Sequence, residues 1–219
     1  MKIQIFYKEK DFNGFKKDIL NAYNDINRHF QDDLEILVRI HKTKNDFNKQ
    51  LKRNTMEWEV ANASHNNEID ILHPNAMEKE SSHNKNEFIP ILKHEMTHLF
   101  IDKLSNGKTI PKWLDEGFAS YLSGQYKIDK WRNNYIEENF CKKLGTPQGW
   151  DKHSNYSAYQ TASLFVYFLI KNYSIIKVKK MISSLDKNYY YSNFKKIFTK
   201  IFKKNLEDLE RRFIKELNK

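Results

Sequence analysis

Two histidines four positions apart, with a glutamate beside the first, form the clearest chemical pattern in this sequence: His94-Glu95-Met96-Thr97-His98. In an α-helix, residues four apart differ by about 40° in direction and by one turn in height, so the two imidazoles point the same way. Two neutral imidazoles on one helix face can hold a single zinc ion. Glu95 would lie one step round the helix, within reach of a water on that ion. The pattern therefore predicts a zinc site with an acid–base residue beside it.

A candidate third ligand follows in residues 111–121, whose sequence is Pro-Lys-Trp-Leu-Asp-Glu-Gly-Phe-Ala-Ser-Tyr. A catalytic zinc site uses three protein ligands and keeps a fourth position open for water. Pro111 suits the first turn of a helix, and that helix would present Glu116. Glu116 could instead be a surface or capping carboxylate, because the helix dipole favours acids in a first turn. Beside the two histidines we favour the ligand interpretation, and we expect His94, His98 and Glu116 to bind one Zn²⁺ ion.

Together, residues 94–98 and 113–119 resemble the gluzincin metallopeptidases, most closely the small peptidase MA-like group. The clan includes thermolysin and the aminopeptidase N family. The resemblance implies a zincin-like fold in which the two histidines and Glu116 bind zinc and Glu95 is the general base. The element order fits over roughly residues 3–217, but only the two zinc-binding segments are specific.

The same resemblance implies two further parts of an active site. A tyrosine at the start of a later helix would donate a hydrogen bond to the oxyanion; Tyr159 matches better than Tyr156, and both stay open. Residues 57–63 would form an edge strand that pairs with an extended peptide, since an edge strand offers unpaired backbone groups. Catalytic roles are therefore expected for Glu95 and Tyr159.

Three positions depart from the family pattern. Asp115 stands where an asparagine usually precedes the third ligand, and it adds negative charge near the site. Ser120 occupies the position of an aspartate that thermolysin-like enzymes place behind a ligand. Residues 75–79, Asn-Ala-Met-Glu-Lys, lack the full pattern with which aminopeptidases grip the substrate amine. The sequence therefore gives no support to exopeptidase specificity.

The elements that must position these residues follow from hydrophobic periodicity. A chain of 219 residues with 39% hydrophobic residues can bury a real core, and six glycines and four prolines favour helix over a turn-rich all-β fold. Strands are predicted at residues 3–7, 34–40, 57–63 and 68–72, and a loop at 73–86. Helices are predicted at residues 11–30, 46–53, 87–104, 112–124, 129–144, 157–173, 175–185, 189–202 and 205–218.

This pattern predicts an α+β, zincin-like fold with an N-terminal mixed sheet and an all-helical C-terminal half around the helix of residues 94–98. We expect one catalytic domain, residues 1–219, made of an α/β substrate-edge subdomain (1–86) and a helical zinc-binding subdomain (87–219). The single cysteine, Cys141, excludes an intramolecular disulfide and a thiolate zinc cluster. No apolar stretch approaches the roughly 20 residues of a membrane span, and the N-terminus is charged too early for a signal peptide, so a cytoplasmic location is expected.

Positive charge is concentrated late in the chain, which carries a formal net charge of +10. The lysines alternate with Ile and Phe at helical spacing, so the favoured interpretation is the solvated face of amphipathic helices, with a polyanion contact as the alternative. These residues are Lys177, Lys179, Lys180, Lys195, Lys196, Lys200, Lys203 and Lys204.

The sequence thus predicts a zinc-dependent metallopeptidase that acts on a peptide or protein substrate; its oligomeric state stays open, with a monomer favoured. One alternative is a weak or inactive zincin that serves as a binding module. It is the less favoured, because a purely structural zinc needs neither Glu95 nor Tyr159. A second alternative, favoured less still, is a nucleic-acid-binding protein that uses the basic C-terminal helices.

Overall fold

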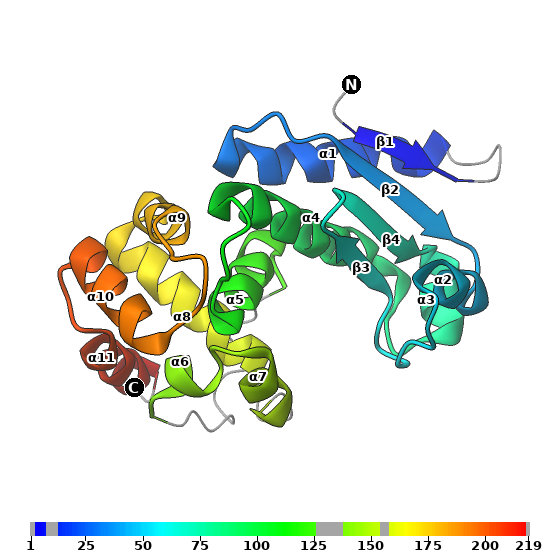
Figure 1. The fold of residues 1–219 in the computed structure, drawn as a ribbon. Coiled ribbons are helices and arrows are strands. Elements are labelled where there is room, and N and C mark those ends of the chain that lie inside the picture. The colour runs from blue at the N-terminus through cyan, green and yellow to red at the C-terminus, as the bar shows by residue number, and fades with distance from the viewer. Residues whose placement is uncertain (1–2, 8–12, 126–137, 154–157, 218–219) are drawn as a thin grey trace. The chain divides into compact units, whose positions relative to one another are not determined.

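The computed structural model describes residues 3–7, 13–125, 138–153 and 158–217. The chain divides into two compact units, residues 1–100 and 101–219. The boundary falls inside one continuous helix, α4 (Phe88–Ser105), which carries both histidines of the sequence motif. Figure 1 shows the order of the elements along the chain.

The N-terminal unit holds a mixed sheet with the strand order β1-β2-β4-β3. The strands are β1 (Ile3–Phe6), β2 (Ile36–His41), β3 (Ala61–Ser64) and β4 (Glu68–Leu72). β1, β2 and β4 run parallel to one another, whereas β3 is antiparallel to β4, and a short polar turn connects β3 to β4. β3 therefore lies at one edge of the sheet.

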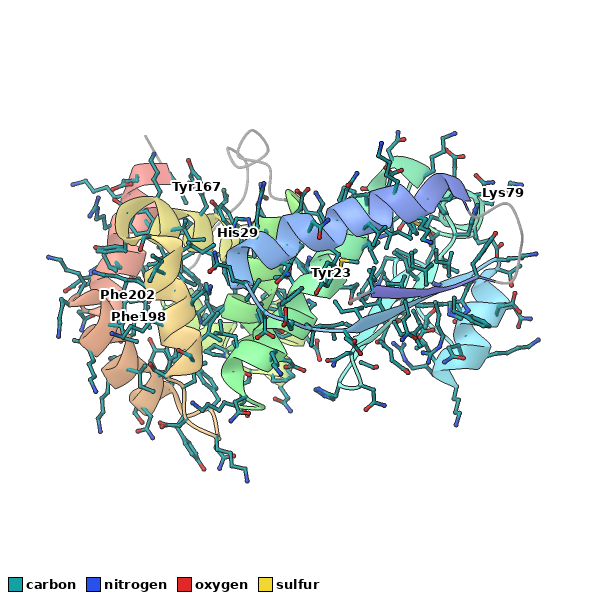
Figure 2. All side chains as sticks on the ribbon, turned by 90° about the horizontal axis from the view of Figure 1, so that it is seen from above. Tyr23, His29, Lys79, Tyr167, Phe198 and Phe202 are labelled. Carbon is teal, nitrogen blue, oxygen red and sulfur yellow. The ribbon has the colours of Figure 1, made fainter. Side chains whose placement is uncertain are left out.

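Helix α1 (Asn13–Phe30) connects β1 to β2 and lies behind them in Figure 1. The buried face of β2 presents Ile36, Val38 and Ile40, which alternate with half-buried neighbours, as expected for a strand with one face in the core. Tyr23 of α1, labelled in Figure 2, is buried and donates a hydrogen bond to the carbonyl of Leu34 at 2.7 Å. This contact fixes the helix at the point where the chain enters β2.

The opposite face of the sheet carries charge. Arg39 donates two hydrogen bonds to Glu68, at 2.6 and 2.7 Å, and His41 lies 2.7 Å from Asp70. Phe47 of α2 (Lys44–Leu51) packs its ring against His41. Two further short elements, α3 (Pro74–Glu80) and the 3₁₀ turn η2 (Lys85–Glu87), lead from β4 into α4.

The described part of the C-terminal unit is helical. Besides the end of α4 it contains α5 (Lys112–Ser123), α6 (Phe140–Lys143), α7 (Pro147–His153), α8 (Ala158–Tyr173), α9 (Ile175–Ser183), α10 (Tyr191–Phe202) and α11 (Leu206–Leu217). Its core is aromatic: Phe198 and Phe202, labelled in Figure 2, stack at 4.4 Å on the buried side of α10. Trp113 of α5 is fully buried against Phe165 and Phe194.

The α+β class, the mixed sheet and the helical C-terminal half agree with the sequence prediction. Most predicted elements are present within a few residues of their expected ends. The predicted helix at 129–144 lies largely outside the described residues, and its described end contains only α6. The subdivision at residue 86 and the single catalytic domain stay predictions.

Two sequence predictions of local structure are wrong, and one helix was missed. Residues 57–60 are not strand, because the Glu59 carboxylate accepts hydrogen bonds from Arg53 and from the amide of Met56 and closes a turn there. Residues 74–80 form a helix rather than a loop, since Pro74 occupies the first turn and the His73 side chain caps it. Helix α7 was not predicted.

Candidate metal centre

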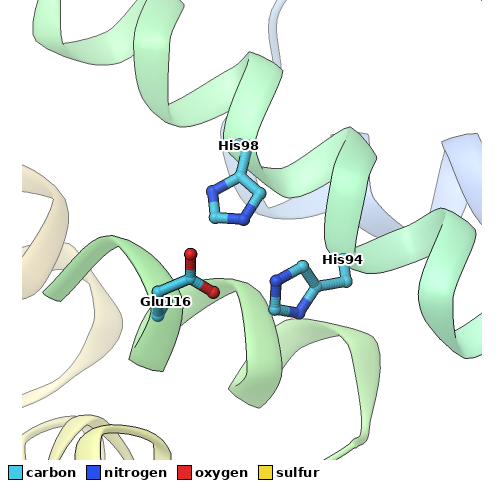
Figure 3. Close-up of side chains that lie close together, drawn as sticks. All are labelled: His94, His98 and Glu116. Carbon is cyan, nitrogen blue, oxygen red and sulfur yellow. The ribbon is translucent and has the colours of Figure 1, made fainter. Parts of the chain in front are cut away.

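His94, His98 and Glu116 lie close together, as expected for a shared set of metal ligands. One ligand atom from each residue can be chosen so that all three lie within 4.8 Å of one another. The imidazoles of His94 and His98 lie one turn apart on α4 with ring centroids at 4.7 Å, and Glu116 comes from α5 (Figure 3). His94 is 9% exposed and Glu116 only 5% exposed. This group could hold a metal ion.

The donor set fits zinc. Two imidazole nitrogens and one carboxylate oxygen are common zinc ligands in proteins, with bonds of about 2.0–2.2 Å. Around a tetrahedral ion such ligands lie roughly 3.4 Å apart, so modest side-chain adjustments from the observed spacing suffice. Glu116 is 5% exposed, so its charge needs positive partners; Lys112, 2.6 Å away, is one of them, and a metal ion would be a second.

Helix α4 holds the two histidines rigidly because most of its surface is buried. Leu92, Met96 and Leu99 are at most 2% exposed, so the helix is fixed through its apolar sides. The chain enters it through a capping box, in which Asn84 and Glu87 satisfy each other's backbone amides. Lys93, beside the first histidine, donates a 2.6 Å hydrogen bond to Asp25 of α1. The rotation of α4 about its own axis is thereby fixed within the N-terminal unit.

Glu95 contacts the edge strand of the sheet. Its carboxylate Oε2 accepts a hydrogen bond from the backbone N–H of Ala63 at 2.9 Å. In the β3–β4 ladder, Leu72 donates to the carbonyl of Val60, so Ala61 and Ala63 direct their backbone groups away from β4. Glu95 therefore takes one of the backbone donors that β3 offers at its open side.

The Glu116 carboxylate has a cationic neighbour on its own helix. Lys112 Nζ lies 2.6 Å from Glu116 Oε1 and 3.9 Å from Asp115 Oδ2. Burial disfavours the charged ammonium, but Glu116 and Asp115 outweigh burial, with a smaller contribution from Tyr159, so the pKa of Lys112 is raised above its ordinary value. Lys112 is therefore protonated at neutral pH and balances part of the acidic charge of this helix.

Helix α5 is held against α8 by a very close approach at Gly117. A Cβ added to Gly117 would lie 2.5 Å from the carbonyl oxygen of Ala162. No side chain fits in that space, so the glycine beside the third candidate ligand has a packing role. Glu116 thus sits on a helix whose distance from α8 is fixed by its next residue.

Tyr159 lies in the first turn of α8 and is 43% exposed. Its ring packs edge-on against Trp150 of α7, with centroids 4.8 Å apart. Tyr156, the other tyrosine considered, lies outside the described residues. The structure thus brings together His94, His98 and Glu116, puts Glu95 against β3 and puts Tyr159 against Trp150; the catalytic roles of the last two stay predictions.

Sequence reasoning missed two features of this region. Lys112 was not singled out, although its i, i+4 spacing from Glu116 on a predicted helix was a usable signal. The contact between Glu95 and Ala63 had no local signal, because it joins residues far apart in the chain and involves a backbone group. A comparison with protein-family models and with curated protein sequences finds no match to this chain.

The basic residues of the C-terminal helices lie at the surface. None of the eight lysines named above is buried, while Phe194, Phe198 and Phe202 fill the opposite side of α10. This is the arrangement of amphipathic helices with a solvated basic face. Among the described residues, no helix is long and apolar enough to cross a membrane.

Proposed function

We propose that this chain is a zinc-dependent metallopeptidase of the gluzincin type, with a zincin-like fold. The observation that carries the proposal is the convergence of His94, His98 and Glu116 next to Glu95. A structural zinc site needs no acid–base residue beside its ligands, and structural sites are commonly closed by a fourth protein ligand. Two histidines, one carboxylate and an adjacent glutamate are the parts of a hydrolytic site.

His94, His98 and Glu116 would hold the metal ion through two nitrogens and one oxygen. Zinc in such a site supplies a Lewis acid that polarises a carbonyl and lowers the pKa of a water toward about 7. The protein supplies the rest: a rigid helix for the histidines, a buried carboxylate, and a proton acceptor one residue from the first ligand.

Glu95 is the proton carrier in this proposal. Its carboxylate takes a proton from the attacking water and passes it to the leaving amine nitrogen as the peptide C–N bond breaks. The amide of Ala63 donates to Oε2 of Glu95 and leaves Oε1 for the water. A carboxylate held by a backbone group is already oriented before the substrate arrives, which lowers the cost of reaching the reactive geometry.

Tyr159 is the proposed donor to the oxyanion. Tyr159 is 43% exposed, and its edge-on contact with Trp150 limits the orientations of its ring. A hydrogen bond that strengthens as the carbonyl oxygen gains charge lowers the barrier by several kcal/mol in comparable sites, roughly 3–4.

The proposed substrate is an extended peptide or protein segment added to the open side of β3. Ala61 directs its backbone N–H and carbonyl away from β4, where a peptide strand can pair with them. Because Glu95 contacts the next outward-facing residue, Ala63, a strand bound there would lie beside the proton acceptor. Backbone pairing of this kind selects for extended shape more than for side-chain identity.

The test compares wild type with Glu95→Gln on a library of quenched fluorescent peptides, with zinc content measured on the same samples. We expect Glu95→Gln to keep its zinc and to lose at least about 100-fold in cleavage rate, in line with general acid–base contributions. Glu78→Gln, the same change at an exposed carboxylate of α3, is the matched control and should cleave normally.

The outcomes separate the proposal from its alternatives. Zinc binding without cleavage of any peptide by wild type would indicate an inactive zincin that acts as a binding module. Cleavage by Glu95→Gln at the wild-type rate would contradict the mechanism. Nucleic-acid binding that weakens steeply with salt, in the absence of zinc, would instead favour the basic helices.

A further inference from the structure

We propose that Lys112 is a positioning residue for the metal centre: its ammonium group holds the Glu116 carboxylate in the orientation that receives the metal ion. This inference rests on the proposed function, because it assigns a role to a neighbour of a proposed ligand. Lys112 itself would not touch the metal or the substrate.

The position of Lys112 is unfavourable for an ordinary surface lysine. It is the first residue of α5, where the positive end of the helix dipole opposes a cation. Its side chain is only 34% exposed, and its backbone N–H donates to the carbonyl of Gly145 at 3.1 Å. A half-buried lysine in this position needs a nearby negative charge that stabilises its ammonium group.

That charge is Glu116. The side chain of Glu116 is 7% exposed, and Lys112 Nζ approaches its Oε1 to 2.6 Å, one turn along the same helix. An ammonium bonded to one carboxylate oxygen restricts rotation of the carboxylate about its last side-chain bond, and so fixes the direction in which the group faces. Hydrogen-bonded partners of metal ligands act in this way, and their loss typically costs 10–100-fold in metal affinity.

Asp115 completes the charge balance. Its Oδ2 lies 3.9 Å from Lys112 Nζ, so the lysine faces two carboxylates and the trio carries a formal charge of −1. Asp115 is the residue that departs from the usual asparagine of the resembled family. Lys112 thus offsets part of the negative charge that Asp115 adds beside the third candidate ligand.

Removal of Lys112 would change the zinc affinity in opposite directions, depending on whether the lysine competes with the metal ion or positions Glu116. If Lys112 acted only as a competing positive charge, its removal would tighten metal binding. If Lys112 positions Glu116, its removal weakens metal binding even though the local charge becomes more negative. The sign of the change in zinc affinity therefore decides between the two effects.

The experiment measures the zinc dissociation constant by competition with a chromophoric chelator, together with the absorption spectrum of the Co²⁺-substituted protein. We expect Lys112→Met to weaken zinc binding about 10–100-fold and to alter the Co²⁺ spectrum. Lys112→Arg should stay within about 3-fold of wild type, since it keeps a charged donor. Lys142→Met, a matched change at an exposed lysine of α6, should bind as wild type does.

Unchanged or tighter zinc binding by folded Lys112→Met would overturn the inference. If Lys112→Met fails to fold, Lys112→Gln replaces it, and affinity equal to that of Lys112→Arg would overturn the inference equally. A wild-type protein that binds no zinc would refute the proposed function. Zinc binding and peptide cleavage by wild type, with equal affinity in the lysine variants, would refute this inference alone.

Discussion

At the residue scale, the two glutamates of the candidate centre differ in what they contact. Glu95 accepts a backbone N–H of the edge strand, whereas Glu116 faces the ammonium of Lys112. A proton acceptor needs an oxygen left accessible to water, and a metal ligand needs a fixed, buried oxygen. The environments of Glu95 and Glu116 match the roles proposed for them.

Tyr159 gives a prediction at this scale. Tyr159→Phe should lower kcat for peptide cleavage about 10²–10³-fold, because it removes a donor to the oxyanion while leaving the ring against Trp150. Zinc content should not change. The control is Tyr167→Phe on the same helix, whose phenol lies beside Tyr121. If Tyr156→Phe has the large effect and Tyr159→Phe does not, the assignment of the two tyrosines must be exchanged.

Glu210 gives a second residue-scale prediction, independent of the metal. It is 1% exposed and accepts the amide of Cys141 at 2.8 Å. Burial raises its pKa above the ordinary value of 4.5, and the nearby Glu207 adds to the shift, against the opposing effects of Cys141 and Arg211. Tyr189 and Tyr191 also interact with this carboxylate, and Lys195 pairs with Glu207.

The sign of the resulting pH dependence follows from linkage. An acid whose pKa is raised in the folded state binds protons more tightly there than in the unfolded state. The stability that its protonated form contributes is fully present below about pH 4.5. That stability is lost as pH rises through the raised pKa, at up to about 1.4 kcal/mol of unfolding free energy per pH unit. Glu210→Gln keeps an acceptor for Cys141 but cannot ionise. The free energy of unfolding of Glu210→Gln, measured with urea at pH 4, 6 and 8, should increase relative to that of wild type as pH rises. A constant difference would contradict the prediction.

At the element scale, the contact between α5 and α8 determines where Glu116 lies in its own unit. Gly117→Ala would place a methyl group 2.5 Å from the Ala162 carbonyl. We expect a loss of about 1–3 kcal/mol in unfolding free energy and weaker zinc binding, since the helices must separate. Thermal unfolding and zinc titration measure the two effects.

The matched control is Gly124→Ala at the end of the same helix. Gly124 has a φ of +76°, and a Cβ added there would meet no atom within 4 Å, so alanine strains the backbone without a clash. It should cost about 1–2 kcal/mol and leave zinc affinity unchanged. Equal zinc affinity in Gly117→Ala and Gly124→Ala would show that the α5–α8 contact does not position the ligand.

The elements also show what could be predicted from sequence. The helix of residues 88–105 was predictable because its apolar residues repeat at helical spacing, and the same spacing puts His94 and His98 on one side. The cap at Asn205 was predictable from its residue type, and its side chain accepts the amides of Glu207 and Asp208. Local signals sufficed in these cases.

Other features depend on contacts that local patterns do not contain. Residues 57–60 read as a strand by hydrophobic alternation, but the salt bridge of Glu59 with Arg53 closes a turn instead. The proximity of Glu116 to the two histidines was predicted from the need for a third ligand and from the motif resemblance, since nothing in the spacing from His98 fixes how α4 and α5 pack. The Ala63–Glu95 hydrogen bond is likewise a contact between distant parts of the chain, which no local pattern contains.

At the scale of the whole molecule, metal binding should stabilise the fold. An ion that binds only the folded chain adds RT ln(1 + [L]/Kd) to the unfolding free energy, about 2.7 kcal/mol at 100 times Kd. We expect added zinc to raise Tm and a chelator to lower it by several degrees. His98→Ala should lose this response, whereas His65→Ala, a change at a histidine outside the metal group, should keep it. A zinc response retained by His98→Ala would point to a different site.

The net charge of +10 also acts on the whole molecule. The basic helices expose lysines on α9 and α10, and such a surface attracts polyanions at low salt. If the charge serves solubility rather than recognition, binding to a nucleic-acid duplex should disappear at physiological ionic strength, as a gel-shift series in rising salt would show. Tight binding that persists there would favour the nucleic-acid alternative.

The most direct test of the central claim is the zinc content of the purified protein, measured by elemental analysis after zinc loading and desalting. We expect about one equivalent of zinc in wild type and none in the double variant His94→Ala, Glu116→Ala. Zinc absent from wild type, or retained by the double variant, would contradict the central claim.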